Sequence, residues 1–309
     1  MWLPRGVSFR SFIKSPRVSH RDRAIQCFNF SFSRCTMASK KIHCCANLGF
    51  MYKEEKDFIV RMKIARQAGF GAVEYPFPRV KHEDIVRCQA ETGLVTILMN
   101  TDLAGSKNGL AAFPDEEPKF LQSLETSINF CKAIQCTNLH VLAGVVEKPT
   151  KEHDATFEKN LRLAADLCQE AGITALIEPI SKIALPNYYL NDFDKAVELI
   201  RKIDHPSLKL QVDLYHLQRT KGNLTDNIKE WFPIIGHIQV AQVPGRNEPD
   251  TPGEINYQYI FDLLSSLNYD KWIGFEYNPK TSGDRTEDWI HAPALKFVSQ
   301  MGLTLKKKS

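Results

Sequence analysis

The sequence lacks the features that mark several common classes of protein. No stretch approaches the roughly 20 apolar residues that a membrane-spanning helix needs, so we expect no membrane span. The turn after the first predicted strand lacks the Gly-x-Gly-x-x-Gly pattern of dinucleotide-binding folds, and the chain has neither a Walker A loop nor a Gly-x-Ser-x-Gly elbow. These absences argue against a Rossmann fold, a P-loop nucleotide binder and an α/β-hydrolase.

The eight cysteines form no Cys-x-x-Cys pair, and their spacing matches no zinc site. They are Cys27, Cys35, Cys44, Cys45, Cys88, Cys131, Cys136 and Cys168. The first 37 residues also lack the apolar core of a secretory signal, so we expect an intracellular protein. In a reducing compartment, we interpret these cysteines as small buried hydrophobic side chains.

An excess of basic over acidic residues is found in the first 37 residues but not in the rest of the chain taken together. The net charge is +4, but residues 1–37 carry one acid, Asp22, and seven basic residues. The seven are Arg5, Arg10, Lys14, Arg17, Arg21, Arg23 and Arg34. Of the 40 basic and 36 acidic residues of the chain, 33 and 35 therefore lie in 38–309, which gives a net charge of −2. A mildly acidic body argues against binding along nucleic-acid phosphates, so we expect no nucleic-acid partner.

Residues 1–37 also differ from the rest of the chain in composition. They are rich in arginine and serine, which is typical of a mitochondrial transit peptide. The alternative is an upstream extension, with Met37 as the usual first residue. We therefore predict an N-terminal extension over 1–37, one folded domain over 38–303 and a basic tail over 304–309. The protein is then mitochondrial if the extension is a transit peptide, and cytoplasmic otherwise.

From residue 42 onward, short apolar runs alternate with longer stretches of helical period. The predicted strands are 42–47, 72–74, 94–100, 138–143, 174–178, 208–213, 237–240 and 272–276. The predicted helices are 55–68, 81–91, 116–134, 152–171, 192–203, 223–231, 257–267 and 286–301. Eight strand–helix units without a change of composition match a single α/β domain, a closed (β/α)8 TIM barrel, better than a doubly wound sheet.

Polar residues end four consecutive predicted strands: Glu178, Asp213, Gln239 and Glu276. In such a barrel the carboxyl ends of the strands meet at one mouth, where catalytic groups lie. Three carboxylates and an amide suit a hard cation, Mg²⁺ or Mn²⁺. Each residue alone could be a helix cap or a solvated loop residue, but four at successive strand ends favour a site. His237 shares a face with Gln239, and we prefer Gln239 as the ligand because it lies nearer the carboxyl end.

Four further residues stand near this predicted mouth. His216 follows the acid of the sixth strand by three residues and is expected over the mouth, with capping or packing as the alternative. His140 lies within the fourth strand and points either inward or into the helical layer. Arg246 stands in a Gly- and Pro-containing loop, where it could pair with a substrate carboxylate or with Glu248. Glu74 ends the second strand, either as a supporting acid or as a surface residue.

Four segments carry a resemblance to a known family. They are Ile-Glu-Pro-Ile at 177–180, Leu-Gln-Val-Asp-Leu-Tyr-His at 210–216, Gly-His-Ile-Gln-Val-Ala-Gln-Val-Pro-Gly-Arg at 236–246, and Gly-Phe-Glu-Tyr at 274–277. They are similar to the motifs of hydroxypyruvate isomerases, which belong to the xylose isomerase-like TIM barrels. The similarity runs from about Lys41 to about Pro279. Many related ketose 3-epimerases carry His where this chain has Gln239, which leaves the identity of the metal open.

The resemblance implies a reversible isomerisation of hydroxypyruvate to 2-hydroxy-3-oxopropanoate through an enediolate. By the family's pattern, Glu178 and Glu276 exchange protons with the substrate, and both approach a divalent metal, Mg²⁺ or Mn²⁺, with Asp213 and Gln239. This is coherent chemistry, because a cation stabilises the oxyanion while two carboxylates serve as acid and base.

The same reading assigns the small hydroxy-keto acid to three binding residues. His216 would donate a hydrogen bond to the developing oxyanion, and Arg246 would hold the substrate carboxylate. His140 completes the set. A homo-oligomer is left open.

Three other functions stay open at this point. A ketose 3-epimerase or sugar isomerase could use the same site, although a neutral sugar would give Arg246 no charge to neutralise. A DNA endonuclease of the same superfamily would need additional histidine ligands and a basic face. A barrel without activity could serve as a binding scaffold, although the presence of both Glu178 and Glu276 argues against it.

Overall fold

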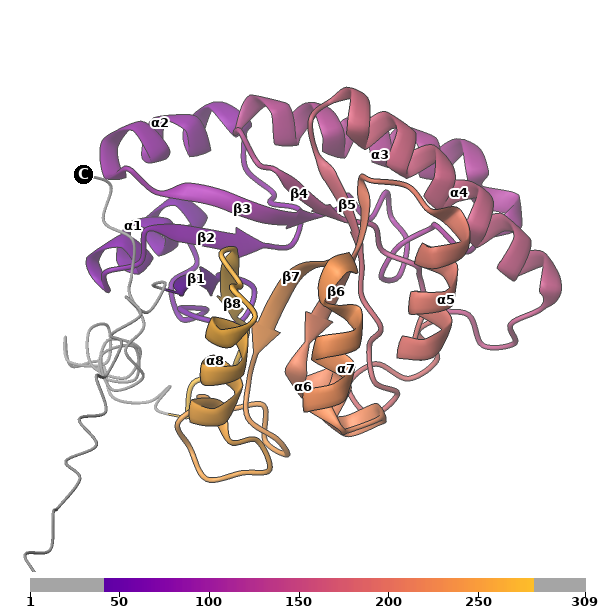
Figure 1. Ribbon diagram of the computed structural model, residues 1–309. Coiled ribbons are helices and arrows are strands. Elements are labelled where there is room, and N and C mark those ends of the chain that lie inside the picture. The colour runs from indigo at the N-terminus through magenta and orange to yellow at the C-terminus, as the bar shows by residue number, and fades with distance from the viewer. Residues whose placement is uncertain (1–41, 281–309) are drawn as a thin grey trace, which may run out of the picture. The chain divides into compact units, whose positions relative to one another are not determined.

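The computed structural model describes residues 42–280, which fold into a closed barrel of eight parallel strands in the order β1 to β8 (Figure 1). This confirms the predicted TIM barrel. The strands are β1 His43–Asn47, β2 Ala72–Tyr75, β3 Val95–Asn100, β4 Asn138–His140, β5 Thr174–Ile177, β6 Leu208–Asp213, β7 Ile235–Val240 and β8 Trp272–Phe275.

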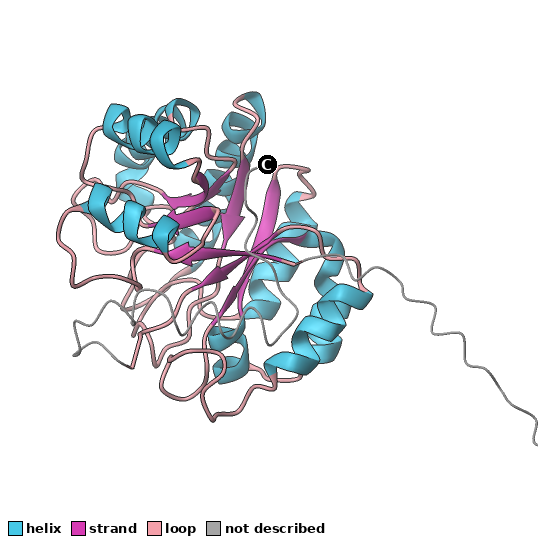
Figure 2. Cartoon of the chain, turned by 90° about the vertical axis from the view of Figure 1, so that its left-hand side faces the viewer, coloured by secondary structure: helices cyan, strands magenta, loops and turns pink. Residues whose placement is uncertain are grey.

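Helices surround these strands in the described part of the chain, with the sheet at the centre (Figure 2). They are α1 Phe58–Gln67, α2 His82–Thr92, α3 Glu117–Ala133, α4 Lys151–Glu170, α5 Phe193–Ile203, α6 Leu214–Thr220, α7 Leu224–Trp231 and α8 Tyr257–Ser266. No helix among residues 42–280 is long and apolar enough to cross a membrane.

Helix α5 shows how the sequence forms this outer layer. Asp192 caps its first turn by accepting from two backbone N–H groups, which would otherwise have no partner in the helix. Its apolar residues recur at helical spacing and are buried, and Phe193 stacks on Trp231 of α7 with ring centroids 5.8 Å apart. Helix and sheet therefore share one apolar core outside the barrel wall.

Because all the strands are parallel, their carboxyl ends open at one mouth. Strand pairing places Asp213 of β6 beside Gln239 of β7, and Gln239 beside Gly274 of β8. The register shifts at two places, between Val73 and Glu74 and between Leu210 and Gln211. Such irregularities change the direction of the side chains that follow, and both of these precede a polar residue of the barrel interior.

The structure differs from the predicted elements in a few places. Strand β4 ends at His140, where the prediction extended it to 143, and β7 begins at Ile235, two residues early. Helix α6 was not predicted; it starts directly after β6, with Asp213 as its N-cap. The predicted helix over 286–301, the segment 1–37 and the tail 304–309 lie outside the described residues. The six cysteines within 42–280 are free and buried, as predicted.

Candidate active site

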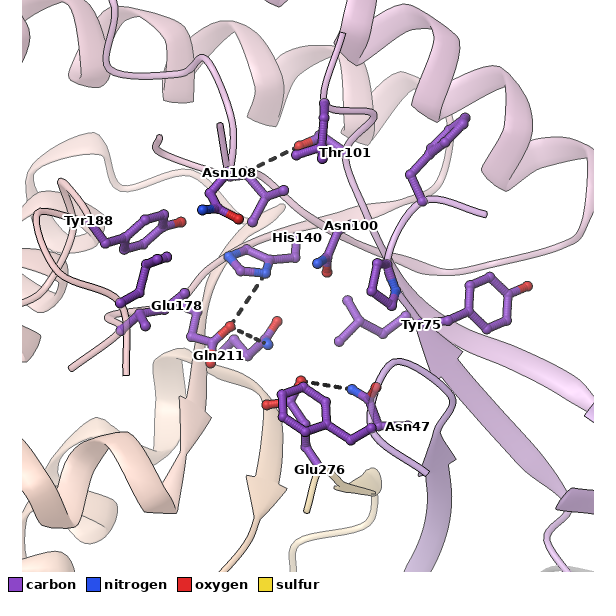
Figure 3. Close-up of a pocket in the computed structure, with 18 of the residues that line it drawn as sticks. Asn47, Tyr75, Asn100, Thr101, Asn108, His140, Glu178, Tyr188, Gln211 and Glu276 are labelled. Atoms are coloured by element: carbon purple, nitrogen blue, oxygen red, sulfur yellow. Dashed lines mark hydrogen bonds and ion pairs between the residues drawn. The ribbon is translucent and has the colours of Figure 1, made fainter. Parts of the chain in front are cut away.

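A cavity of about 580 Å³ opens at the mouth of the barrel. Residues from the ends of most strands line it, including Asn47, His140, Glu178, Gln239 and Glu276. Figure 3 shows the side chains of His140, Glu178 and Glu276 directed toward the same space. Of the four residues that the sequence places at successive strand ends, Glu178, Gln239 and Glu276 therefore line one cavity, and Asp213 does not.

Glu178, Glu276 and Arg246 line the acidic side of this cavity, and the carboxylate of Asp213, which is not among the lining residues, pairs with Arg246. Arg246 Nη2 donates to Asp213 Oδ2 at 2.8 Å and also to Glu276 Oε2, so the arginine joins β6 to the residue after β8. His216 lies between Asp213 and Glu178, the residue directly after β5. Its Nε2 is 3.4 Å from Asp213 Oδ2 and 3.8 Å from Glu178 Oε1. Asp213 is fully buried and Glu178 is 4% exposed.

The acidic side is short of positive charge. Burial raises the pKa of Glu178 well above its usual range, and the Glu276 and Asp213 carboxylates raise it further. Burial likewise raises the pKa of Glu276, although Arg246 opposes the rise. If all three carboxylates are ionised, one guanidinium leaves a net charge of −2, which a divalent cation would balance.

The two histidines of the cavity are neutral at neutral pH. Burial lowers the pKa of His140 to about 3, with nearby His216 adding to the effect. Burial also lowers the pKa of His216 to about 4, although Asp213 opposes it. The backbone N–H of Ser181 donates to His216 Nδ1 at 3.4 Å, so the ring proton is on Nε2, which faces the carboxylates. His140 points into the barrel, with Nδ1 at 3.4 Å from Glu178 Oε2.

Arg246 reaches the cavity from the loop after β7. Its guanidinium lies between the rings of Phe50 and Tyr215, at 4.4 and 4.9 Å from their centroids. Burial opposes its charge, but Glu276 and Asp213 outweigh burial and raise its pKa. The alternative pairing with Glu248 is not what the structure shows, because Glu248 Oε1 accepts from the backbone N–H of Lys280.

His237 and Gln239 have different neighbours in the barrel. His237 Nε2 is 2.7 Å from Glu74 Oε2, in the barrel interior and away from the mouth carboxylates. Gln239 Oε1 accepts from Gln211 Nε2 at 2.7 Å, and Gln239 lines the cavity. Glu74 is fully buried, so the surface alternative for this residue is wrong: its side chain points inward and four buried donors surround it.

Two cavity residues were missed by the sequence reasoning. Gln211 stands two residues before Asp213 on β6, and the period of a strand puts both side chains on the inner face. Its Nε2 donates to Glu178 Oε2 at 2.8 Å. Asn47 ends β1 and donates to Glu276 Oε1 at 2.8 Å. The strand-end rule would have found Asn47 had it been applied to the first half of the barrel.

The residues present fit a divalent metal. Carboxylate oxygens of Glu178 and Asp213 lie within 4.8 Å of each other. Glu178 Oε1 and Gln211 Oε1 are buried without a hydrogen-bond partner among the described residues, and both residues line the cavity. Buried acceptors without partners are costly unless a ligand satisfies them. The oxygen-rich donor set is the kind that hard cations prefer, whereas the identity of the metal is not determined by it.

Comparison with known proteins agrees with this geometry. The model of the xylose isomerase-like TIM barrel family matches residues 62–296. The chain belongs to this family. The match confirms the family resemblance predicted from the strand-end motifs.

Two curated relatives of this family carry isomerase names. A 2-oxo-tetronate isomerase of Pectobacterium atrosepticum is 40% identical over 252 residues, which are 79% of this chain and 94% of that protein. The hydroxypyruvate isomerase of Escherichia coli is 34% identical over 251 residues, 79% of this chain and 96% of that protein. Both relatives are therefore matched over nearly their whole length.

A solved structure of the same family has a different name. It is titled AP endonuclease, family 2, from Brucella melitensis, and has a TM-score of 0.74 at 36% identity. The match covers 77% of this chain and 94% of that one. The family thus includes proteins named for two unlike reactions, and the choice between them depends on the cavity.

Proposed function

We propose that this protein is an isomerase that interconverts hydroxypyruvate and 2-hydroxy-3-oxopropanoate. The observation that carries the proposal is a pair of glutamates, the buried Glu178 and the partly exposed Glu276, which face one cavity and whose pKa values are both raised. A raised pKa lets a carboxyl group hold a proton near neutral pH and exchange it with a weak carbon acid. The names of the matched relatives support the same reaction class.

The chemistry moves one proton between neighbouring carbons. One glutamate removes a proton from C3 of hydroxypyruvate, and the electron pair forms the C2–C3 double bond of the enediolate. The other glutamate returns a proton to C2, and the proton of the C3 hydroxyl passes to the C2 oxygen, which leaves an aldehyde at C3 and a hydroxyl at C2. His216, protonated on Nε2, is placed to donate a hydrogen bond to the developing oxyanion.

Glu178, Asp213, Gln239 and Glu276 would hold a divalent metal, with Mg²⁺ or Mn²⁺ as the expected ions. When bound, such an ion supplies positive charge against the oxyanion of the enediolate. Arg246 would exchange its contacts with the carboxylates of the protein for the carboxylate of the substrate, since a guanidinium matches a carboxylate in two parallel hydrogen bonds. His140 Nε2, buried without a partner among the described residues, is the remaining ring nitrogen that could form a hydrogen bond with the substrate.

The test is an assay of the purified full chain with hydroxypyruvate. We expect the aldehyde product to form and, in D₂O, deuterium to enter C2 of that product, with both signals lost in metal-stripped protein and restored by Mg²⁺ or Mn²⁺. Neutral ketoses serve as the comparison substrates, because they give Arg246 no charge to pair with. Faster turnover of a neutral ketose than of hydroxypyruvate would instead favour the sugar-epimerase alternative.

The endonuclease alternative has one observation in its favour, the name of the Brucella structure. A protein that binds DNA through its phosphates shows affinity that falls steeply with salt. The net charge of −2 over 38–309 leads us to expect no such binding. Salt-sensitive binding and cleavage of abasic-site DNA by the full chain would contradict the isomerase proposal.

A further inference from the structure

One buried carboxylate takes no direct part in the proposed reaction. Glu74 of β2 is fully buried and is not among the residues that line the cavity. Its Oε1 accepts from Asn47 Nδ2 at 2.9 Å and from Gln239 Nε2 at 2.7 Å. Its Oε2 lies 2.7 Å from His237 Nε2 and 3.4 Å from the Cys45 Sγ that donates to it. Four donors surround the two oxygens, which is the environment of an ionised carboxylate.

Two features of the backbone make room for this carboxylate. The register of β2 against β3 shifts immediately before Glu74. On β8, Gly274 faces the carboxylate so closely that a Cβ there would lie 2.3 Å from Glu74 Oε1 and 2.5 Å from Oε2. Any side chain at position 274 would therefore displace the carboxylate from the barrel interior.

The position of Glu74 determines how two amides face the cavity. A carboxylate accepts hydrogen bonds and cannot donate them, so Gln239 must turn its NH₂ group toward Glu74. The carbonyl oxygen of Gln239 is then directed toward Gln211, at 2.7 Å, and the cavity. Asn47 is held from two sides, because its Oδ1 accepts from the Gly49 N–H at 2.9 Å. Its Nδ2 therefore reaches both Glu74 and the catalytic carboxylate of Glu276.

We propose that Glu74 is a positioning residue of the active site. From the barrel interior it keeps the oxygen of Gln239 facing the metal position and the N–H of Asn47 facing Glu276. His237 and Cys45 hold Glu74 in place, and Gly274 provides the space. The inference rests on the proposed function, since it assigns a support to the ligand and acid–base residues of that same site.

The first test is Glu74→Gln, which keeps the shape of the side chain but introduces a group that can donate. Gln239 is then free to turn its NH₂ group toward the metal position. We expect the Mn²⁺ dissociation constant, measured from the EPR signal of free Mn²⁺, to rise about 10- to 100-fold, the usual cost of losing a support to a metal ligand. We also expect kcat for hydroxypyruvate to fall more than KM rises, because Glu276 loses its alignment.

The matched control is Thr96→Val on the neighbouring strand β3. Thr96 is also buried and hydrogen-bonded, to Tyr75 and Gln89, but does not contact Glu74 or the cavity. Its removal costs a buried hydrogen bond without affecting either amide. We expect its Mn²⁺ affinity and kcat to stay within about twofold of the wild type.

A double variant that exchanges the carboxylate and the amide between positions 74 and 239 distinguishes a positioning role of Glu74 from a general loss of stability. Gln239→Glu alone sets a second carboxylate against Glu74 and is expected to weaken Mn²⁺ binding. In Glu74→Gln combined with Gln239→Glu, the amide introduced at 74 donates to a carboxylate at 239 that presents oxygen on both sides. Mn²⁺ affinity should then return to within about threefold of the wild type. Turnover should stay low, because Asn47 has lost the acceptor that held it.

The outcomes decide the matter separately from the proposed function. Wild-type affinity and kcat in Glu74→Gln, or a double variant that binds Mn²⁺ no better than the single variants, would overturn the positioning role. If Glu74→Gln does not fold, Glu74→Asp replaces it: the withdrawn carboxylate should weaken Mn²⁺ binding about tenfold, and wild-type affinity would overturn the proposal. A wild type that binds Mn²⁺ but leaves hydroxypyruvate unchanged contradicts only the proposed function.

Discussion

The barrel contains two sets of carboxylates that differ in their hydrogen-bond partners and neighbouring charges. The interior set is Glu74, and the mouth set is Glu178 and Glu276. Burial raises the pKa of interior Glu74, but the hydrogen bonds and charge of its neighbours, with His237 foremost and then Gln239, lower it overall. At the mouth, burial raises the pKa values of Glu178 and Glu276, and their neighbours do not bring them down. The pKa of the same residue type is thus lowered in one place and raised in the other.

The difference follows from missing donors at Glu178 and from like charge near Glu276. Both oxygens of Glu276 accept hydrogen bonds, from Asn47 and Arg246, but the Asp213 and Glu74 carboxylates raise its pKa. Both oxygens of Glu74 have partners, whereas at the mouth Glu178 Oε1, Gln211 Oε1 and His140 Nε2 have no hydrogen-bond partner among residues 42–280. Folding rarely leaves buried polar atoms unpaired unless something else binds them. Glu74, whose oxygens both have donors, is therefore suited to holding neighbouring side chains in place. The mouth, with its unpaired polar atoms, is suited to ligand binding and proton exchange.

The largest expected effect comes from removing an acid of the mouth. Glu276→Gln should lower kcat for hydroxypyruvate about 10³-fold, because an amide cannot exchange the proton. The melting temperature of the metal-free protein should not fall, since the substitution removes a carboxylate that repels its neighbours. Kinetics and thermal unfolding measure the two effects. Retention of most of the wild-type rate would refute an acid–base role for this residue.

Acid sensitivity gives a second way to probe the mouth. The folded protein keeps His140 neutral down to about pH 3, whereas the unfolded chain takes up the proton near pH 6.5. Between these values protons favour unfolding, so the free energy of unfolding falls as pH is lowered. His140→Asn should flatten this fall by about 1.4 kcal/mol per pH unit below pH 6.5, measured in urea.

The surroundings of Glu74 can be changed by a substitution that leaves Glu74 itself in place. Gly274→Ala places a methyl group against Glu74 and should lower the free energy of unfolding by about 1–3 kcal/mol. If the two sets are coupled through Gln239, Mn²⁺ affinity should fall as well. Chemical denaturation and Mn²⁺ titration test the variant. An unchanged affinity in a destabilised protein would show that the interior serves stability alone.

The smallest effect is expected at the guanidinium. Arg246→Lys keeps the charge but loses the planar pair of donors, so KM for hydroxypyruvate should rise about tenfold with a smaller change in kcat. KM for a neutral ketose should not change. Steady-state kinetics on both substrates provide the measurement. An equal rise of KM for the neutral ketose would mean that Arg246 does not recognise the carboxylate.

Strand period and strand ends predicted much of this arrangement. Glu178, Asp213, Gln239 and Glu276 follow apolar runs, and parallel strands must bring such residues to one mouth. Helix α6 escaped prediction because it begins directly after β6, where its residues continue the motif of the strand. The inward position of Glu74 could not be predicted either, since a residue at the end of a short strand has two faces available.

The sequence by itself determined the barrel and the strand ends that carry Glu178, Gln239 and Glu276, because alternation of short apolar runs with helical periods admits few topologies. Only the tertiary structure decided which donors pair with which. Arg246 reaches Asp213 and Glu276 across the mouth, and Glu74 crosses the interior to His237 through the space left by Gly274. The hydrogen bond from Gln239 to Glu74 likewise joins residues 165 positions apart in the sequence. Such contacts depend on how the closed sheet directs each side chain, which local sequence patterns do not encode.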